Sequence, residues 1–200
     1  MSTTVLLFSS GMDSFIGNWY VKYLLQPDDK LIRLYVNIHS RYSDYELNLL
    51  NRWYPKDYFK VLDVCSLRSV EKDDAFVPNR NAIIAALAQS YMDADRIFFN
   101  ATKDDRVFDG SVEFRDNMSK TLSVSMGKPI IVDSVLKEYE KAEWISKYCG
   151  ENNTRIMQLA EKTYTCYNKD LYEEEVPWFQ KTAHGFEESG KILIYGCLEC

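Results

Sequence analysis

The stretch Val5-Leu6-Leu7-Phe8-Ser9-Ser10-Gly11-Met12-Asp13-Ser14 decides the fold of this chain. Its apolar first half is typical of a buried strand, and it ends abruptly in small, hydroxylated and acidic residues. Phe15, Ile16 and Trp19 then begin an apolar pattern with helical spacing. A strand, a tight polar turn and a helix present backbone N–H groups to a phosphate. The stretch therefore predicts a phosphate site, and the alternative is an ordinary βα turn capped by Ser or Asp.

The composition of the 200 residues favours one globular domain. Hydrophobic residues make up 46% and aromatic residues 14% of the chain, which is enough for a core. The net charge of −6 argues against binding of duplex nucleic acid through a basic face. The chain starts without a basic leader segment, and its apolar runs are far shorter than the ~20 residues of a membrane span. We expect a cytoplasmic protein with a small-molecule substrate and no direct nucleic-acid or membrane partner.

Strand-like and helix-like segments alternate along the chain. The expected strands span residues 3–8, 31–39, 59–64, 95–100 and 129–133, and the expected helices span 13–25, 44–53, 80–92, 111–126 and 141–149. This alternation predicts a doubly wound α/β domain with a five-stranded parallel sheet covered on both faces. Ligands of such sheets bind at the carboxyl ends of the strands, where the strand order reverses. After residue 163 the pattern loosens, and the composition of residues 172–190 predicts an insertion or a lid.

A basic residue stands at the start of the helix that follows the third strand. The segment is Phe76-Val77-Pro78-Asn79-Arg80-Asn81, in which proline fixes the entry and Arg80 occupies the first turn. Because a helix N-terminus is itself positive, Arg80 indicates a nearby anion, unless it is a solvated surface residue. Asn79 tolerates positive φ better than most residues, which suits a tight turn.

Charged residues also follow the later strands. Asp104, Asp105 and Asp109 come after the fourth strand, where carboxylates bind Mg²⁺ on phosphate or hydrogen-bond a base. A solvated acidic turn is the alternative for each of them. Lys141 opens a helix, and its ammonium either neutralises phosphate or carboxylate charge in a transition state or lies in solvent.

The cysteines indicate metal or redox chemistry more than disulfides. The chain has five of them, Cys65, Cys149, Cys166, Cys197 and Cys200. An odd number without a leader segment argues against a disulfide framework. Cys197 and Cys200 form a C-x-x-C pair with Cys166 upstream. Cys65 is expected in the core, and His39 is expected to be a capping or core side chain.

These segments together resemble the 7-cyano-7-deazaguanine synthases, a subfamily of the PP-loop ATP pyrophosphatases. Ser9-Ser10-Gly11-Met12-Asp13-Ser14 is similar to their SGGxDS signature, with Ser10 in place of the second Gly. It lacks the Gly-Lys-Ser/Thr of a Walker A loop. Residues 76–81 resemble the FVPGRN motif, with Asn79 in place of Gly. The resemblance extends from Val5 to Cys200.

The resemblance continues through the charged segments. Asp104 or Asp105 matches the aspartate of the family's G-x-x-x-x-D, and Asp109 matches the aspartate of YPDCR. The Cys-Arg of that motif is Gly110-Ser111 here, which is a departure at the substrate site. Lys141 resembles the lysine of the K-x-E-I helix, which faces the active site in the family.

The last part of the chain resembles the family's zinc motif. Thr163-Tyr164-Thr165-Cys166-Tyr167 is similar to T-W-S-C-Y, whose cysteine is the first zinc ligand, and Cys197 and Cys200 supply the last two. One thiolate of the motif is missing because Ile194 takes its place, and zinc needs four ligands. His184 is the expected fourth ligand. Cys149 and a carboxylate at the chain end are alternatives, and redox thiols or an empty site are the other interpretations.

The resemblance implies an adenine nucleotide alpha hydrolase-like domain over residues 1–160. It implies a small helical zinc-binding lobe over residues 161–200 that is not an independent domain. The nucleotide site would consist of Phe8, Ser9, Ser10, Gly11, Met12, Asp13, Ser14 and Asn81. The catalytic residues would be Arg80, Asp104, Asp109 and Lys141. The metal ligands would be Cys166, Cys197, Cys200 and His184.

The implied activity is the ATP-dependent conversion of 7-carboxy-7-deazaguanine and ammonia to 7-cyano-7-deazaguanine. ATP, Mg²⁺ and Zn²⁺ are the implied cofactors, and a homodimer is implied by analogy. The family's product feeds tRNA modification in bacteria and DNA modification in some phages. Two alternatives remain: a ligase that stops at the amide or adenylates another substrate, and a nucleotide-binding module without catalysis.

Overall fold

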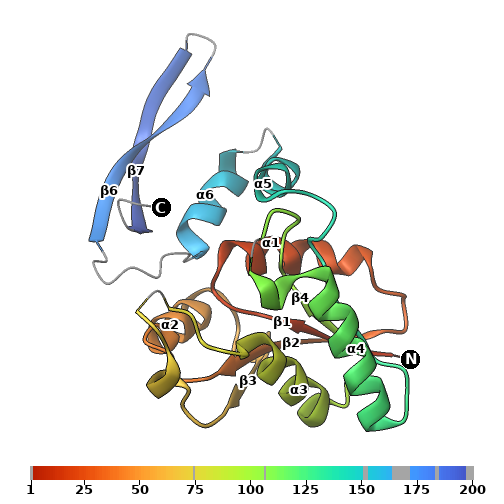
Figure 1. The fold of residues 1–200 in the computed structure, drawn as a ribbon. Helices are drawn as coiled ribbons and strands as arrows, with labels where there is room; N and C mark the ends of the chain where they lie inside the picture. The colour runs from red at the N-terminus through yellow and green to blue at the C-terminus, as the bar shows by residue number, and fades with distance from the viewer. Residues whose placement is uncertain are drawn as a thin grey trace.

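The computed structural model describes residues 2–73, 75–105, 107–150, 153–163, 172–182 and 185–196, the last two ranges as backbone (Figure 1). One parallel sheet contains five strands, β1 (Thr3–Leu7), β2 (Lys30–Asn37), β3 (Lys60–Asp63), β4 (Arg96–Phe99) and β5 (Ile131–Ser134). Their order is β3-β2-β1-β4-β5. The predicted α/β class and the five-stranded parallel sheet are confirmed.

Helices connect the strands. They are α1 (Met12–Tyr20), α2 (Ser43–Trp53), α3 (Arg80–Met92), α4 (Val112–Met126), α5 (Lys141–Cys149) and α6 (Asn153–Lys162). The sequence predicts the first five, and the bounds of α3 and α5 agree with that prediction; α6 is additional. Short 3-10 turns span η1 (Val21–Tyr23), η2 (Arg68–Val70) and η3 (Phe108–Gly110). None of the helices in the described ranges is long and apolar enough to cross a membrane.

The two faces of the sheet carry separate cores. Alternate residues of a strand point to opposite faces, so Val5 of β1 packs with the side chains of α3 and α4. Its neighbour Leu6 packs on the other face against α1 and α5, where Trp144 is fully buried. Figure 1 shows α3 and α4 on one side of the sheet and α1 and α5 on the other. Burial on both faces explains why Val5, Leu6 and Leu7 form an unbroken apolar run in β1.

The order in which strands are added to the sheet reverses at the central strand, β1. From β1 the chain moves to β2 and β3 on one side, and it then returns to β4 on the other side of β1. The carboxyl ends of β1 and β4 therefore flank the point where open α/β sheets bind ligands. Ser9 and Asn100 follow these two strands.

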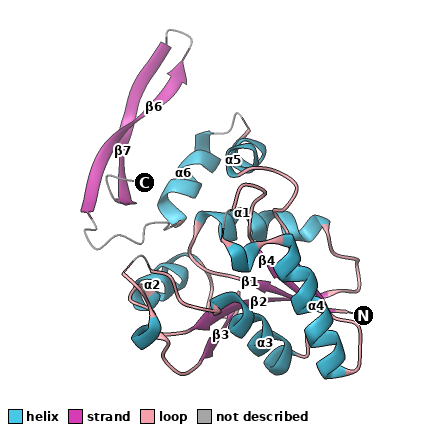
Figure 2. Ribbon diagram, in the orientation of Figure 1, coloured by secondary structure: helices cyan, strands magenta, loops and turns pink. Residues whose placement is uncertain are grey.

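The C-terminal segment differs from the helical lobe implied by the resemblance. Its described residues form an antiparallel hairpin of β6 (Tyr172–Thr182) and β7 (Gly185–Gly196), with a register irregularity between Trp178 and Phe179 (Figure 2). The expected helical structure is therefore wrong for these residues. The run from Ile192 to Tyr195 is apolar, aromatic and partly β-branched, which favours a strand. The division of the chain at residue 160 stays a prediction.

Candidate active site

The loop after β1 is held in shape by its own hydroxyl groups. The Ser14 hydroxyl accepts a hydrogen bond from the Ser9 N–H at 2.8 Å and donates to the Leu7 carbonyl at 3.4 Å. The Ser9 hydroxyl accepts from the Gly11 N–H at 3.2 Å. Gly11 is the N-cap of α1 and supplies no side-chain cap, so no side chain at that position occupies the N–H groups of the first turn. An uncapped helix N-terminus at the end of a strand suits an anion.

Asn100 ties the loop to the neighbouring strand. Its Nδ2 donates to the Leu7 carbonyl at 2.7 Å and to the Ser14 hydroxyl at 3.1 Å. The contact requires a glycine in α1, because a Cβ on Gly17 would lie 1.9 Å from Oδ1 of Asn100. The same Cβ would lie 2.9 Å from Cγ2 of Val135. Asn100 therefore joins the carboxyl ends of β1 and β4 across the reversal point, a role that the sequence does not reveal.

Asp13 and Lys141 meet above the loop. The Lys141 ammonium lies 3.1 Å from Oδ2 of Asp13, whereas Oδ1 of Asp13 is buried without a hydrogen-bond partner in the described part of the chain. Burial raises the pKa of the Asp13 carboxyl, and the Lys141 charge opposes that rise. Asp105 and Asp104 also raise the pKa of Asp13 through repulsion. The site thus combines an incompletely satisfied carboxylate with one ammonium.

The two consecutive aspartates after β4 have different environments. Asp104 accepts hydrogen bonds from the Thr102 hydroxyl at 2.7 Å and from the Lys141 N–H at 3.0 Å, and these bonds hold its pKa below the usual value. Its carboxylate therefore binds the first N–H of α5, where an anion is favourable. Asp105 is exposed and lines the pocket. Of the two residues that match the family's aspartate, Asp105 lines the pocket. Asp104 does not line it and is linked to it through its hydrogen bond with Lys141.

Arg80 and Asn81 lie where the motif predicts, at the start of α3. Asn79 before them has φ of 57°, which confirms that an asparagine serves the turn where the family has glycine. Asn81 donates its backbone N–H to Oδ2 of Asp109 at 3.3 Å and its Nδ2 to the Asp109 carbonyl at 3.0 Å. Arg80 and Asn81 line the pocket, and Asp109 holds Asn81 from η3 without being a lining residue.

The Gly110-Ser111 departure has a structural role. The Ser111 hydroxyl accepts from the Phe114 N–H at 3.1 Å and caps α4. Arg115, from the next turn, is nearly fully buried, donates to the Gly110 carbonyl and lies 3.3 Å from Oδ1 of Asp133. This part of the chain therefore fixes η3 against α4 and β5.

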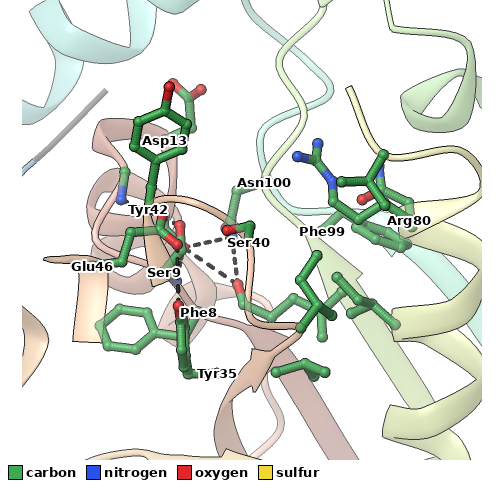
Figure 3. Close-up of a pocket in the computed structure, with 18 of the residues that line it drawn as sticks. Phe8, Ser9, Asp13, Tyr35, Ser40, Tyr42, Glu46, Arg80, Phe99 and Asn100 are labelled. Atoms are coloured by element: carbon green, nitrogen blue, oxygen red, sulfur yellow. Dashed lines mark hydrogen bonds between the residues drawn. The ribbon is translucent and has the colours of Figure 1, made fainter. Parts of the chain in front are cut away.

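A single cavity of about 310 Å³ connects these groups (Figure 3). Its predicted lining residues are Phe8, Ser9, Gly11, Met12, Asp13, Ser14, Arg80, Asn81 and Lys141. Ser10 is not among them: it is 2% exposed, and its hydroxyl has no hydrogen-bond partner in the described residues. The residue that departs from the family signature thus turns its side chain away from the pocket.

The second half of the cavity comes from β2 and α2 and was not predicted. It contains Tyr35, Ser40, Tyr42, Ser43 and Glu46. Burial raises the pKa of Glu46 to about 7, against the lowering effects of the Tyr35 hydrogen bond and the Arg80 charge. The sequence signal that points to Glu46 is an acidic residue in the first turn of a helix that follows a buried strand.

The comparison with protein families identifies the family of this chain. The model of the queuosine biosynthesis protein QueC matches residues 56–178, which is more than half of the sequence. The chain belongs to the QueC family. The match includes Arg80, Asn81, Asp109 and Lys141, whereas it begins after the Ser9–Ser14 loop. The phosphate loop of this QueC family member therefore rests on its geometry and on its own motif.

One of two similar solved structures supports the fold. The U34-tRNA thiolase NcsA from Methanococcus maripaludis, with its [4Fe-4S] cluster, matches with a TM-score of 0.51 and 14% identity over 82% of this chain. The alignment spans 59% of the thiolase chain. A predicted subunit of tRNA methyltransferase from Methanocaldococcus jannaschii matches with a TM-score of 0.46 and 17% identity, covering 88% of this chain and 80% of that chain. No curated protein matches the sequence.

The residues of this QueC family member fit a magnesium nucleotide. Oδ1 of Asp13 is a buried acceptor without a partner, and Asp105 lines the same pocket. The described residues contain no group of three or more His, Cys, Asp and Glu side chains that would hold a metal ion alone. Mg²⁺ is commonly held by one or two carboxylates together with substrate phosphates, and this donor set suits that mode.

The zinc ligands predicted for the family lie outside the described residues. These ligands are Cys166, His184, Cys197 and Cys200, and the zinc site therefore stays a prediction. Cys149, the alternative ligand, is buried in the core beside α1, and burial raises the pKa of its thiol.

Cys65 is exposed and not in the core, so the expectation that it is a core residue is wrong. His39 contacts Asp63 at 3.0 Å at the end of β2.

Proposed function

We propose that this protein converts 7-carboxy-7-deazaguanine and ammonia to 7-cyano-7-deazaguanine by two adenylations. The observation that carries the proposal is the uncapped start of α1 in the cavity, with Lys141 paired to Asp13 beside it. Membership of the QueC family supports the substrate class.

The loop and α1 would bind the phosphates of ATP. The N–H groups of the first turn and the positive end of the helix dipole favour an anion at this position. Lys141 would add a charge that offsets the negative charge developing on the α-phosphate. Mg²⁺ held by Asp13 and Asp105 would shield the repulsion between the phosphates and the attacking carboxylate.

The reaction needs ATP because a carboxylate is a poor electrophile. Its oxygen attacks the α-phosphorus, and pyrophosphate leaves. Ammonia then adds to the acyl adenylate, and AMP leaves as the amide forms with loss of a proton. A second ATP adenylates the amide oxygen with release of pyrophosphate, and loss of AMP and a proton gives the nitrile. The enzyme's contribution is positioning and charge stabilisation, for which the pocket offers cations and helix termini.

Arg80 and Asn81 would place the acceptor carboxylate. Arg80 and Phe99 both line the cavity (Figure 3), and Asn81 is fixed by two hydrogen bonds to Asp109. A guanidinium binds a carboxylate with directional N–H donors, which suits the orientation that in-line attack requires.

The test is a reaction with the purified full chain, ATP, Mg²⁺, ammonium and 7-carboxy-7-deazaguanine. AMP, pyrophosphate and the mass of the base product are followed, and two AMP per nitrile are expected. Amide with one AMP would favour the ligase that stops at the amide. Bound ATP without AMP would contradict an enzyme of this type and favour the nucleotide-binding module.

A further inference from the structure

A carboxylate occupies the part of the cavity that the phosphate chemistry does not use. Glu46 lies in the first turn of α2 and lines the pocket. Its Oε2 accepts a hydrogen bond from the Tyr35 hydroxyl at 3.2 Å. That hydroxyl also lies 3.3 Å from the Ser43 carbonyl. Tyr35 is fixed by its buried position in β2, so it holds the carboxyl group in one orientation.

Glu46 has no cation beside it in the described residues. No Lys, Arg or His side chain of those residues lies within 4 Å of its oxygens. Arg80 interacts with it only at longer range, and Figure 3 shows the two side chains at opposite ends of the labelled lining residues. A half-buried carboxylate without an ion pair is destabilised unless a ligand supplies donors.

The chemistry of an ionised carboxylate limits the ligand. It only accepts hydrogen bonds, and its two oxygens match two adjacent N–H donors. The edge of guanine and of 7-deazaguanine offers such a pair, N1–H beside the 2-amino group. Adenine offers an amino group beside the acceptor N1, which would face a carboxylate oxygen unfavourably. The carboxylate therefore distinguishes a guanine-type edge from an adenine edge.

We propose that Glu46 binds the N1–H and 2-amino edge of the deazapurine while Arg80, at the other end of the cavity, binds its carboxylate. The inference rests on the proposed function for the identity of the base. It assigns the selectivity for a 2-amino base to α2, and it assigns Tyr35 as the positioning residue that orients Glu46. Val36, Val77 and Ile84 add apolar side chains to the lining of the same cavity.

The experiment measures binding of two bases by calorimetry to the full chain with ATP withheld. The bases are 7-carboxy-7-deazaguanine and its analogue without the 2-amino group, 7-carboxy-7-deazahypoxanthine. The wild type is expected to prefer the amino base by about 10- to 100-fold, the value of a hydrogen bond to a charged group. Glu46→Gln and Glu46→Ala should bind the two bases within about threefold of each other. Tyr35→Phe should lose part of the preference.

Matched controls separate this role from folding. Asp44→Asn removes an exposed acidic group from the same helix turn and should keep the full preference. Thermal unfolding of each variant shows that it is folded. The dissociation constant for ATP, measured separately, should be unchanged by Glu46→Gln. Loss of ATP affinity with an intact base preference would place Glu46 at the adenine and overturn the inference.

The outcomes distinguish the inference from the proposed function. AMP formation with an unaltered 2-amino preference in Glu46→Ala would overturn the inference and leave the function standing. A Glu46-dependent preference for 7-carboxy-7-deazaguanine over 7-carboxy-7-deazahypoxanthine without AMP formation would contradict the function and support the inference. If the wild type binds neither base, both are wrong.

Discussion

The Lys141 ammonium lies 3.1 Å from Oδ2 of Asp13, so the first residue of α5 contacts the first turn of α1. The pair connects two segments that are far apart in the sequence, directly beside the loop that ends β1. The other oxygen of Asp13 is buried without a partner in the residues described. Because Lys141 also lines the cavity, an anion that enters it would share the ammonium with Asp13.

Replacing Lys141 by methionine should remove this charge without removing the aliphatic stem. We expect kcat/KM to fall by about 10²- to 10³-fold, the usual effect of losing one charge-stabilising donor. Initial rates of AMP release provide the measurement. Lys137→Met is the matched control, because Lys137 pairs with Asp133 and does not line the cavity. Equal rates in Lys141→Met and the wild type would contradict a catalytic role for Lys141.

Gly17→Ala should destabilise the protein although alanine favours helices. The new Cβ would meet Oδ1 of Asn100 at 1.9 Å and Val135 at 2.9 Å. We expect the free energy of unfolding to fall by about 1–3 kcal/mol from overpacking, which exceeds the helix gain of about 0.5–1 kcal/mol. Urea unfolding measures the change.

A double-mutant cycle tests the contact between position 17 and Asn100. Asn100→Ala removes the nearer clash, so the double variant should be more stable than the sum of the two single effects predicts. Strict additivity would show that Asn100 is not what excludes a side chain at position 17.

We expect Asp109 to contribute to activity by positioning Asn81 more than by its charge. Asp109→Asn keeps an acceptor for the Asn81 N–H, whereas Asp109→Ala removes it. We expect Asp109→Ala to raise the KM for the base by about tenfold, the value of one hydrogen bond, and Asp109→Asn to have a smaller effect. If both variants lose activity equally, the Asp109 charge touches the substrate directly.

The stability of the protein should depend on pH through Glu46. Burial raises its pKa from 4.5 to about 7, while the Tyr35 hydrogen bond and the Arg80 charge oppose the rise. Between these values the folded state holds more protons than the unfolded state, so stability falls as pH rises from 4.5 to 7 and then levels.

Glu46→Gln should remove that part of the pH dependence. Relative to the wild type, the variant should gain about 1–3 kcal/mol of unfolding free energy between pH 5 and pH 8. Urea unfolding at both pH values gives the comparison, with Asp44→Asn as a control that follows the wild type. Parallel curves for Glu46→Gln and the wild type would contradict the raised pKa of Glu46.

The zinc prediction is tested on the purified full chain. Elemental analysis should find one zinc per chain, and Cys166→Ala should lose it because a tetrahedral structural site needs all four ligands. Cys149→Ala is the control, since this thiol is buried among apolar residues and should not affect zinc content. Unchanged zinc in Cys166→Ala would show that the ligand set is different.

Much of the fold follows from local patterns. The strands and the first five helices follow the predicted segments because each combines an apolar run or a helical period with a clear end, as at Gln26-Pro27. Helix α6 and the hairpin were not predicted, although residues 153–162 are amphipathic at helical spacing and residues 192–195 favour a strand. The Arg80 and Lys141 positions follow from motifs that open helices, and both line the cavity.

The contacts between distant segments required the tertiary structure. The sequence by itself determined the phosphate loop, the parallel sheet and the family's charged residues, because these depend on local periodicity and on motifs a few residues long. Only the tertiary structure decided that Asp105 lines the cavity while Asp104 accepts the first N–H of α5, and that Asn100 needs Gly17. It alone also placed Glu46 and Arg80 at opposite ends of the pocket lining. The physical reason is that strand order and helix packing, which no local pattern encodes, set which loops meet at the carboxyl edge of the sheet.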